Sequence, residues 1–81
     1  MLSIEAKSKL KPEDVILRAV KFFGPDGYGL AVKSQAGCYV EFEGGGGGVG
    51  ITASAKDKGS TVSFETREWE SQVKNFIGKI K

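Results

Sequence analysis

Three runs of alternating apolar and polar residues, separated by glycine-bearing turns, constrain this chain more than any other feature. They lie within residues 36–66, AGCYVEFEGGGGGVGITASAKDKGSTVSFET. Alternation with a period of two is typical of strands that bury one face. Five consecutive glycines, Gly44 to Gly48, separate the first run from the second, and residues 56–59 (KDKG) separate the second from the third. The stretch predicts an antiparallel meander with one apolar face and one polar face.

Similar patterns predict the other elements. Residues 1–10 alternate as a strand, and lysines at its polar positions keep such a strand from recruiting another chain. The sequence KPED begins a helix, because proline suits the first turn and carboxylates complement the helix dipole. Leu30 and Val32 are expected to face inward from the second strand. The expected elements are a strand over residues 1–10, a helix over 12–23, strands near 28–35, 38–43, 49–56 and 61–65, and a closing helix.

The closing helix has the clearest apolar stripe of the chain. Thr66 is expected to cap its N-terminus, since a threonine hydroxyl can accept a hydrogen bond from a free backbone N–H of the first turn. The apolar positions that follow are spaced as one buried helix face requires. They are Trp69, Val73, Phe76, Ile77 and Ile80.

These elements predict a two-layer α+β fold in one domain over residues 1–81. A five-stranded antiparallel sheet should have both helices on its apolar face, in the chain order β-α-β-β-β-β-α. A spatial strand order of 1-5-4-3-2 is expected, with the first helix carrying the chain from one edge of the sheet to the other.

Charge and cysteine content argue against several classes of function. The chain has 12 basic and 10 acidic residues, and two of the basic residues are arginine. Nucleic-acid binding normally needs clustered Lys and Arg, so no nucleic-acid partner is expected. The N-terminal residues carry charge early and contain no long apolar run, so neither a signal peptide nor membrane association is expected. One cysteine excludes an internal disulfide and suits a reducing compartment, which predicts a cytoplasmic protein.

The glycine block formally matches a phosphate-binding pattern. Gly45, Gly47 and Gly50 fit G-x-G-x-x-G, but that motif needs a helix after its last glycine, and residues 51–54 alternate like a strand. The favoured interpretation is a hairpin tip, or glycines within strands that let a helix backbone pass close. A loop that becomes ordered on meeting a partner is the remaining alternative.

No catalytic or metal site is expected. The chain has no histidine, so general acid–base catalysis near neutral pH would need a strongly perturbed Glu, Lys or Cys. The one cysteine, Cys38, alternates with apolar residues and is expected to fill the core. Glu41 and Glu43, with Glu5 and Glu65 nearby, could hold a metal ion or serve as acid and base. Such strand glutamates are more typical of cross-strand pairs with lysine, and zinc lacks its usual ligands here. No cofactor is expected.

Trp69 and the lysines each have two interpretations. Trp69 is expected to anchor the core, and the alternative is that it walls a ligand pocket between helix and sheet. Lysines along one edge and on the closing helix could converge into a small patch for an anionic ligand, although a solvated surface is the favoured interpretation. They are Lys7, Lys9, Lys11, Lys74, Lys79 and Lys81.

With this order of elements, the chain resembles a reduced helix-grip domain of the START-like superfamily. The meander from Tyr28 to Glu65 and the closing sequence TREWESQVKNFIGKI carry the resemblance. It implies a curved antiparallel sheet that wraps a long C-terminal helix, with a hydrophobic ligand cavity between them. In so short a chain the cavity is expected to be small, or filled by aromatic side chains. The family has no universal catalytic residues, so none is carried over.

The first functional hypothesis is a non-catalytic binding module that holds a small apolar or amphipathic ligand between the closing helix and the sheet. The alternative is a protein-interaction or homo-oligomerisation module that uses an edge strand or the Gly44–Gly48 loop, since small domains often supplement a thin core by association. The sequence leaves ligand identity and oligomeric state open. The ligand pocket is expected to be lined by Val40, Phe42, Ile51, Phe64, Trp69, Val73 and Phe76.

Overall fold

The computed structural model describes residues 2–80, so the predictions that involve Met1 and Lys81 lie outside the described residues. The predicted order of strand, helix, four strands and helix is confirmed. The elements are β1 (Leu2–Ser8), α1 (Pro12–Phe23), β2 (Ala31–Ala36), β3 (Tyr39–Gly44), β4 (Gly47–Lys56), β5 (Gly59–Arg67) and α2 (Glu70–Ile80).

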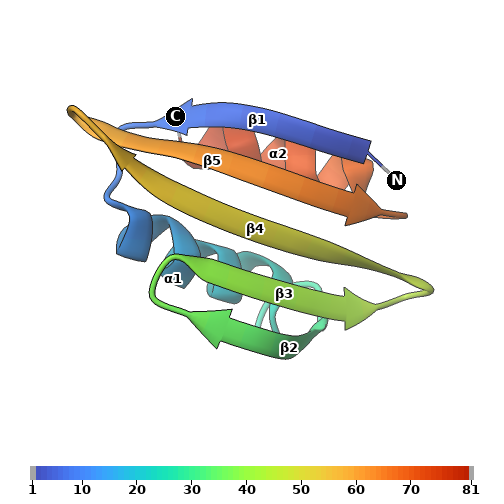
Figure 1. Ribbon diagram of the computed structural model, residues 1–81. Helices are drawn as coiled ribbons and strands as arrows, with labels where there is room; N and C mark the ends of the chain where they lie inside the picture. The colour runs from blue at the N-terminus through green and yellow to red at the C-terminus, as the bar shows by residue number, and fades with distance from the viewer. Residues whose placement is uncertain (1, 81) are drawn as a thin grey trace.

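The five strands form one antiparallel sheet in the predicted spatial order, β1-β5-β4-β3-β2 (Figure 1). β1 and β2 lie at opposite edges, and α1 carries the chain from one edge to the other. The central strand β4 pairs with β3 through residues 47–52 and with β5 through residues 48–56. The long β4–β5 hairpin is therefore the centre of the sheet, and the other strands lie on either side of it.

Both helices lie on the same face of the sheet and leave the other face open (Figure 1). α1 packs mainly on β3 and β4, and α2 packs on β5 and β1. The alternation of the strands explains this arrangement. In β4, for example, Ile51 and Ala53 are buried beneath the helices, whereas Thr52 and Ser54 are exposed on the open face. The predicted two-layer α+β fold is confirmed.

Four phenylalanines hold the two layers together. Phe23 of α1, Phe42 of β3, Phe64 of β5 and Phe76 of α2 are each at most 1% exposed. The ring centroid of Phe23 lies 5.6 Å from those of Phe42 and Phe76, and Phe64 lies 6.1 Å from Phe76. Burying a side chain of this size contributes about 1.5–3 kcal/mol. These rings therefore fix both helices against the sheet and against each other.

The glycine block forms a tight hairpin between β3 and β4. Gly44 pairs with Gly47, which leaves Gly45 and Gly46 as the two turn residues, with φ angles of 59° and 81°. Such positive values suit the turn of a two-residue hairpin, and glycine adopts them at little cost. A Cβ atom on Gly47 would lie 2.0 Å from the carbonyl oxygen of Arg67. The hairpin-tip interpretation is confirmed. The expected helix backbone is not what lies close to the glycines, because Gly47 faces the end of β5 at Arg67 and the adjoining Glu68.

Cys38 does not fill the core, so that prediction is wrong. The thiol is exposed in the turn between β2 and β3. Ala36 pairs with Tyr39, so the chain reverses at residues 37–38 and β3 begins one residue later than predicted. The alternation of Cys38 with Val40 is therefore interrupted by the turn.

β2 is shorter and more exposed than the pattern predicts. Leu30, which precedes it, is buried as expected, but Val32 is 37% exposed. β2 is an edge strand whose six residues are all exposed, and its pairing with β3 shifts register between Val32 and Ser34. Apolar alternation predicts the strand correctly, but it does not reveal that an edge strand lacks a neighbour to cover it.

The N-terminus of α2 also differs from the prediction. Thr66 lies within β5, where its buried hydroxyl donates a hydrogen bond of 3.3 Å to the carbonyl oxygen of Gly48. The chain then turns at Glu68, whose φ of 71° is left-handed, and α2 begins at Glu70. Thr66 continues the inward-facing positions of β5, so strand pairing prevails over its preference for a helix cap.

Candidate functional site

The residues predicted to line a ligand pocket lie together between the sheet and the helices. All except Trp69 are at most 1% exposed, and Trp69 is partly buried. Phe23 of α1 belongs to the same cluster, and its position in an amphipathic helix is the signal that would have added it to the prediction. The six fully buried members of the predicted set are Val40, Phe42, Ile51, Phe64, Val73 and Phe76.

A hollow of about 380 Å³ lies on the surface between α1 and α2, which run side by side in Figure 1. We call it the interhelical groove. Residues one helical turn apart share a face of a helix, and such pairs from both helices border the groove. Its lining consists of Arg18, Lys21 and Phe22 of α1 and Phe76, Lys79 and Ile80 of α2.

The floor of the interhelical groove is apolar. Phe76 and Ile80 are each 1% exposed, and Phe22 is partly buried against the core. The C-terminal end of α2 is held in place by Ser8, whose buried hydroxyl donates a hydrogen bond to the carbonyl oxygen of Ile80. The same hydroxyl accepts a hydrogen bond of 3.1 Å from the backbone N–H of Leu10. The floor is therefore built on fixed elements.

The rim of the interhelical groove is cationic. Arg18, Lys21 and Lys79 are exposed and border the apolar floor. Lys21 and Lys79 occupy the last turns of their helices, where positive charge complements the helix dipole. Within residues 2–80 the ion pair is that of Lys33 with Glu43, so none of the three rim cations forms an ion pair with a carboxylate of the described residues.

The basic patch predicted from the sequence overlaps this rim only in part. Of the lysines in that prediction, Lys79 lines the groove, and Lys81 lies outside the described residues. Arg18 and Lys21 were not singled out by the sequence pattern. Their positions on the flank of a predicted helix that faces a second helix are the signal that could have found them.

A row of aromatic side chains leads away from the groove. The ring of Phe22 lies 5.3 Å from that of Phe76 and 5.3 Å from that of Tyr28. Tyr28 in turn lies 5.7 Å from Trp69. Tyr28 is 47% exposed, and Phe22 and Trp69 are partly buried. The row therefore joins the groove to the end of the molecule where α2 begins.

Trp69 connects this aromatic row to the glycine hairpin. Its indole N–H donates a hydrogen bond of 3.0 Å to the carbonyl oxygen of Gly44. A Cβ atom on Gly45 would lie 2.8 Å from the indole ring, so the ring rests directly on the turn. The backbone carbonyl of Trp69 accepts the hydrogen bond from the N–H of Val73 at 2.9 Å, which starts α2. Trp69 thus secures the hairpin and positions the helix.

A second hollow, of about 350 Å³, lies on the open face of the sheet over β3, β4 and β5. Gly48 and Gly50 of β4 contribute to its floor because they carry no side chain. Gly50 pairs with Glu41 on one side and Glu65 on the other, so two carboxylates flank this gap. The strands that carry them are about 9–10 Å apart, twice the usual strand spacing.

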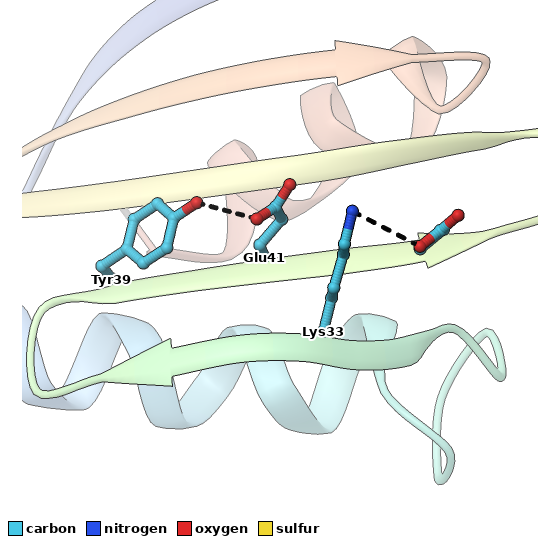
Figure 2. Close-up of polar contacts among 4 residues, drawn as sticks. Lys33, Tyr39 and Glu41 are labelled. Carbon is cyan, nitrogen blue, oxygen red and sulfur yellow. Dashed lines mark hydrogen bonds and ion pairs between the residues drawn. The ribbon is translucent and has the colours of Figure 1, made fainter.

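Tyr39 and Glu41, which both line this open-face hollow, are joined by a hydrogen bond (Figure 2). The Tyr39 hydroxyl donates a hydrogen bond of 3.1 Å to Oε1 of Glu41. Partial burial, this hydrogen bond and the negative charges of Glu41 and Glu65 together raise the pKa of Tyr39 above its ordinary value of 10.0. Lys33 on the same face pairs with Glu43 at 3.8 Å, as expected for cross-strand carboxylates.

The acidic residues considered for catalysis or metal binding are spread over the open face. Glu5 pairs with Ser63 at the β1 side, whereas Glu43 pairs with Lys33 near the opposite edge. In the part of the chain that the structure describes, no three Asp, Glu, Cys or His side chains gather to hold a metal ion. The arrangement offers polar contacts on an open surface.

No protein-family model matches the chain, and no curated protein or solved structure matches it either. The resemblance to helix-grip domains is not tested by these comparisons and stays a prediction. Neither α1 nor α2 is long and apolar enough to cross a membrane.

Proposed function

We propose that this chain is a non-catalytic binding module for a small amphipathic ligand, and that the ligand lies in the interhelical groove with α2 as one wall. The observation that carries the proposal is the combination of an apolar floor with a polar rim in one hollow. Its volume of about 380 Å³ falls in the range of small-molecule sites. The resemblance to helix-grip domains implies a ligand between the closing helix and the sheet, and the proposal keeps only the closing helix as a wall of the site.

The proposed position differs from the one expected from the sequence. A ligand between α2 and the sheet would have to displace side chains such as Phe64 and Phe76, which are at most 1% exposed. Removing packed aromatic side chains from a core costs about 3–5 kcal/mol each. A ligand in the interhelical groove would contact the flank of α2 that faces α1, and it would not have to displace these side chains.

The test uses phenylnaphthylamine, a neutral apolar probe whose fluorescence rises on leaving water. Phe22→Ala removes part of the groove floor, and Leu17→Ala removes an apolar side chain that is 57% exposed on the same helix. We expect Phe22→Ala to weaken probe affinity about three- to tenfold, as loss of aromatic contacts predicts. Leu17→Ala should leave affinity unchanged. Equal effects of the two variants, with both folded by circular dichroism, would count against the groove.

An interaction module that uses the β2 edge is the second candidate. The observation that favours it is that all six β2 residues are exposed, including the apolar Val32. An open edge strand offers free backbone N–H and C=O groups to another strand. The Gly44–Gly48 segment is less suited to this role, because Trp69 already covers part of its turn. Sedimentation that shows a strict monomer at millimolar concentration would remove the homo-oligomer version.

A cytoplasmic location is proposed together with this function. An exposed thiol such as that of Cys38 stays reduced in a compartment where glutathione and thioredoxin keep cysteines unoxidised. Efficient export of the native chain by cells that express it would count against this location.

A further inference from the structure

The charged residues described in the lining of the interhelical groove are all cationic, a feature that the proposed function does not require. Among residues 2–80, its lining contains three cationic side chains, from Arg18, Lys21 and Lys79, and no acidic one. Asp14 precedes Arg18 by one helical turn but forms no ion pair with it. Like charges that share a rim repel one another, and the low dielectric of the adjacent apolar floor strengthens their field. An anion placed between them would relieve this repulsion.

The apolar surface of the groove continues beyond the groove as a row of aromatic side chains. From Phe76 and Ile80 on the floor it continues to Phe22 and then, through ring contacts of 5.3 Å and 5.7 Å, to Tyr28 and Trp69. Tyr28 is the most exposed member of this row, at 47%. Arg18, Lys21 and Lys79 line the groove, whereas Tyr28 and Trp69 lie outside its lining. The cationic side chains therefore line the groove, and the aromatic row continues beyond it.

We propose that the groove binds a soluble anionic amphiphile, with its charged head among Arg18, Lys21 and Lys79 and its apolar tail along Phe22 toward Trp69. This inference rests on the proposed function and specifies the ligand class: a free, single-chain carboxylate or sulfonate. A neutral ligand would leave the cationic rim without a partner, and a cationic ligand would be repelled by it. A small inorganic anion would leave the apolar floor and aromatic row in water.

The first experiment compares two pairs of probes that differ only in their head group. Anilinonaphthalene sulfonate is matched with phenylnaphthylamine, and laurate below its micelle concentration is matched with dodecanol. We expect the anionic member of each pair to bind about tenfold more tightly at low salt, as a few exposed ion pairs to the head group would give. The preference should shrink at high salt, because salt screens exposed charges within a Debye length of about 10 Å at 0.1 M.

Two double variants locate the charge effect. Arg18→Gln with Lys79→Gln removes two rim charges, and Lys33→Gln with Lys74→Gln removes two charges outside the groove lining. We expect the rim variant to weaken laurate binding about five- to tenfold and to leave dodecanol binding unchanged, as for exposed or partly exposed ion pairs. The control variant should bind both ligands as the parent chain does. These substitutions are on exposed side chains, so the fold should persist.

The orientation is tested with the single tryptophan. Nitroxide-labelled stearates with the label near the methyl end should quench Trp69 fluorescence more than stearates with the label near the carboxylate. Equal quenching, or stronger quenching from the carboxylate end, would overturn the proposed direction of the tail.

The outcomes separate the two proposals. If neither member of a probe pair binds, both the amphipathic-ligand function and its charge preference are refuted. Equal binding of neutral and anionic members, or equal losses in the rim and control variants, would overturn the anionic preference and leave the function standing. Binding to phosphatidylglycerol vesicles without binding to monomeric laurate would overturn the inference in favour of a membrane-surface ligand.

Discussion

The glycine block offers a sharp test of the fold, because its members have different roles. Gly47 lies beneath the backbone that leaves β5, and a Cβ atom there would be 2.0 Å from the carbonyl oxygen of Arg67 and 2.8 Å from the Cβ of Glu68. Gly46 has a positive φ of 81°, but a Cβ atom there would meet no atom within 4 Å. Gly47→Ala and Gly46→Ala therefore separate a steric requirement from a conformational one.

The magnitudes follow from these distances. Ordinary van der Waals contact begins near 3.4 Å, so Gly47→Ala must separate β4 from the Arg67 backbone by about 1.4 Å (3.4 minus 2.0). Overpacking of this kind costs about 1–3 kcal/mol, and loss of the adjacent strand hydrogen bond adds about 1 kcal/mol. We expect a total of about 2–4 kcal/mol. Gly46→Ala should cost about 1 kcal/mol, the strain of a left-handed alanine less the entropy it removes from the unfolded chain.

Chemical denaturation followed by circular dichroism measures both changes. A domain of this size has a total stability of about 4–12 kcal/mol, so Gly47→Ala should remove a large share of it. Its melting temperature should fall by at least about 8 °C, against about 4–8 °C for Gly46→Ala. A Gly47→Ala variant as stable as Gly46→Ala, or more stable, would refute the close passage of the β5–α2 connection over β4.

Three further predictions concern single side chains. Trp69→Phe should cost about 1–2 kcal/mol in urea denaturation, because the carbonyl oxygen of Gly44 loses its indole donor; no change would contradict that role. Glu41→Gln should lower the pKa of Tyr39 toward 10.0 in a tyrosinate absorbance titration, with Tyr39→Phe as the blank. Because the folded pKa of Tyr39 is raised, its contribution to stability is present below pH 10.0 and is lost as pH rises through the folded pKa; Glu41→Gln should reduce this loss. Phe64→Ala should cost about 3–5 kcal/mol as a fully buried ring, and a cost below about 1 kcal/mol would contradict its central position.

Much of the fold could be predicted because the strands alternate strictly and each helix has one apolar stripe. Val49, Ile51 and Ala53 are all buried in β4, as a period of two requires. The errors fall where tertiary position decides. Cys38 continues an apolar alternation but falls in a turn, and Thr66 has the properties of a helix cap but is held by strand pairing. Local patterns do not specify where a hairpin reverses or where a strand stops.

The candidate site was less accessible to prediction, because it depends on the contact between two helices. The sequence identifies the buried faces of α1 and α2, and these faces meet the sheet. It does not reveal which flanks of the helices face each other, so Arg18, Lys21 and Phe22 were not predicted as a site. Phe76 was predicted for its buried ring, and it also lines the groove.

The central claim is that an anionic amphiphile binds between α1 and α2, and amide chemical shifts during a laurate titration test it most directly. We expect the largest shift changes in residues 18–22 and 76–80, together with the indole N–H of Trp69. Residues 48–50 on the open face of the sheet should change little. Largest changes over that open face, or no saturable change at any residue, would contradict binding of the anionic amphiphile between α1 and α2.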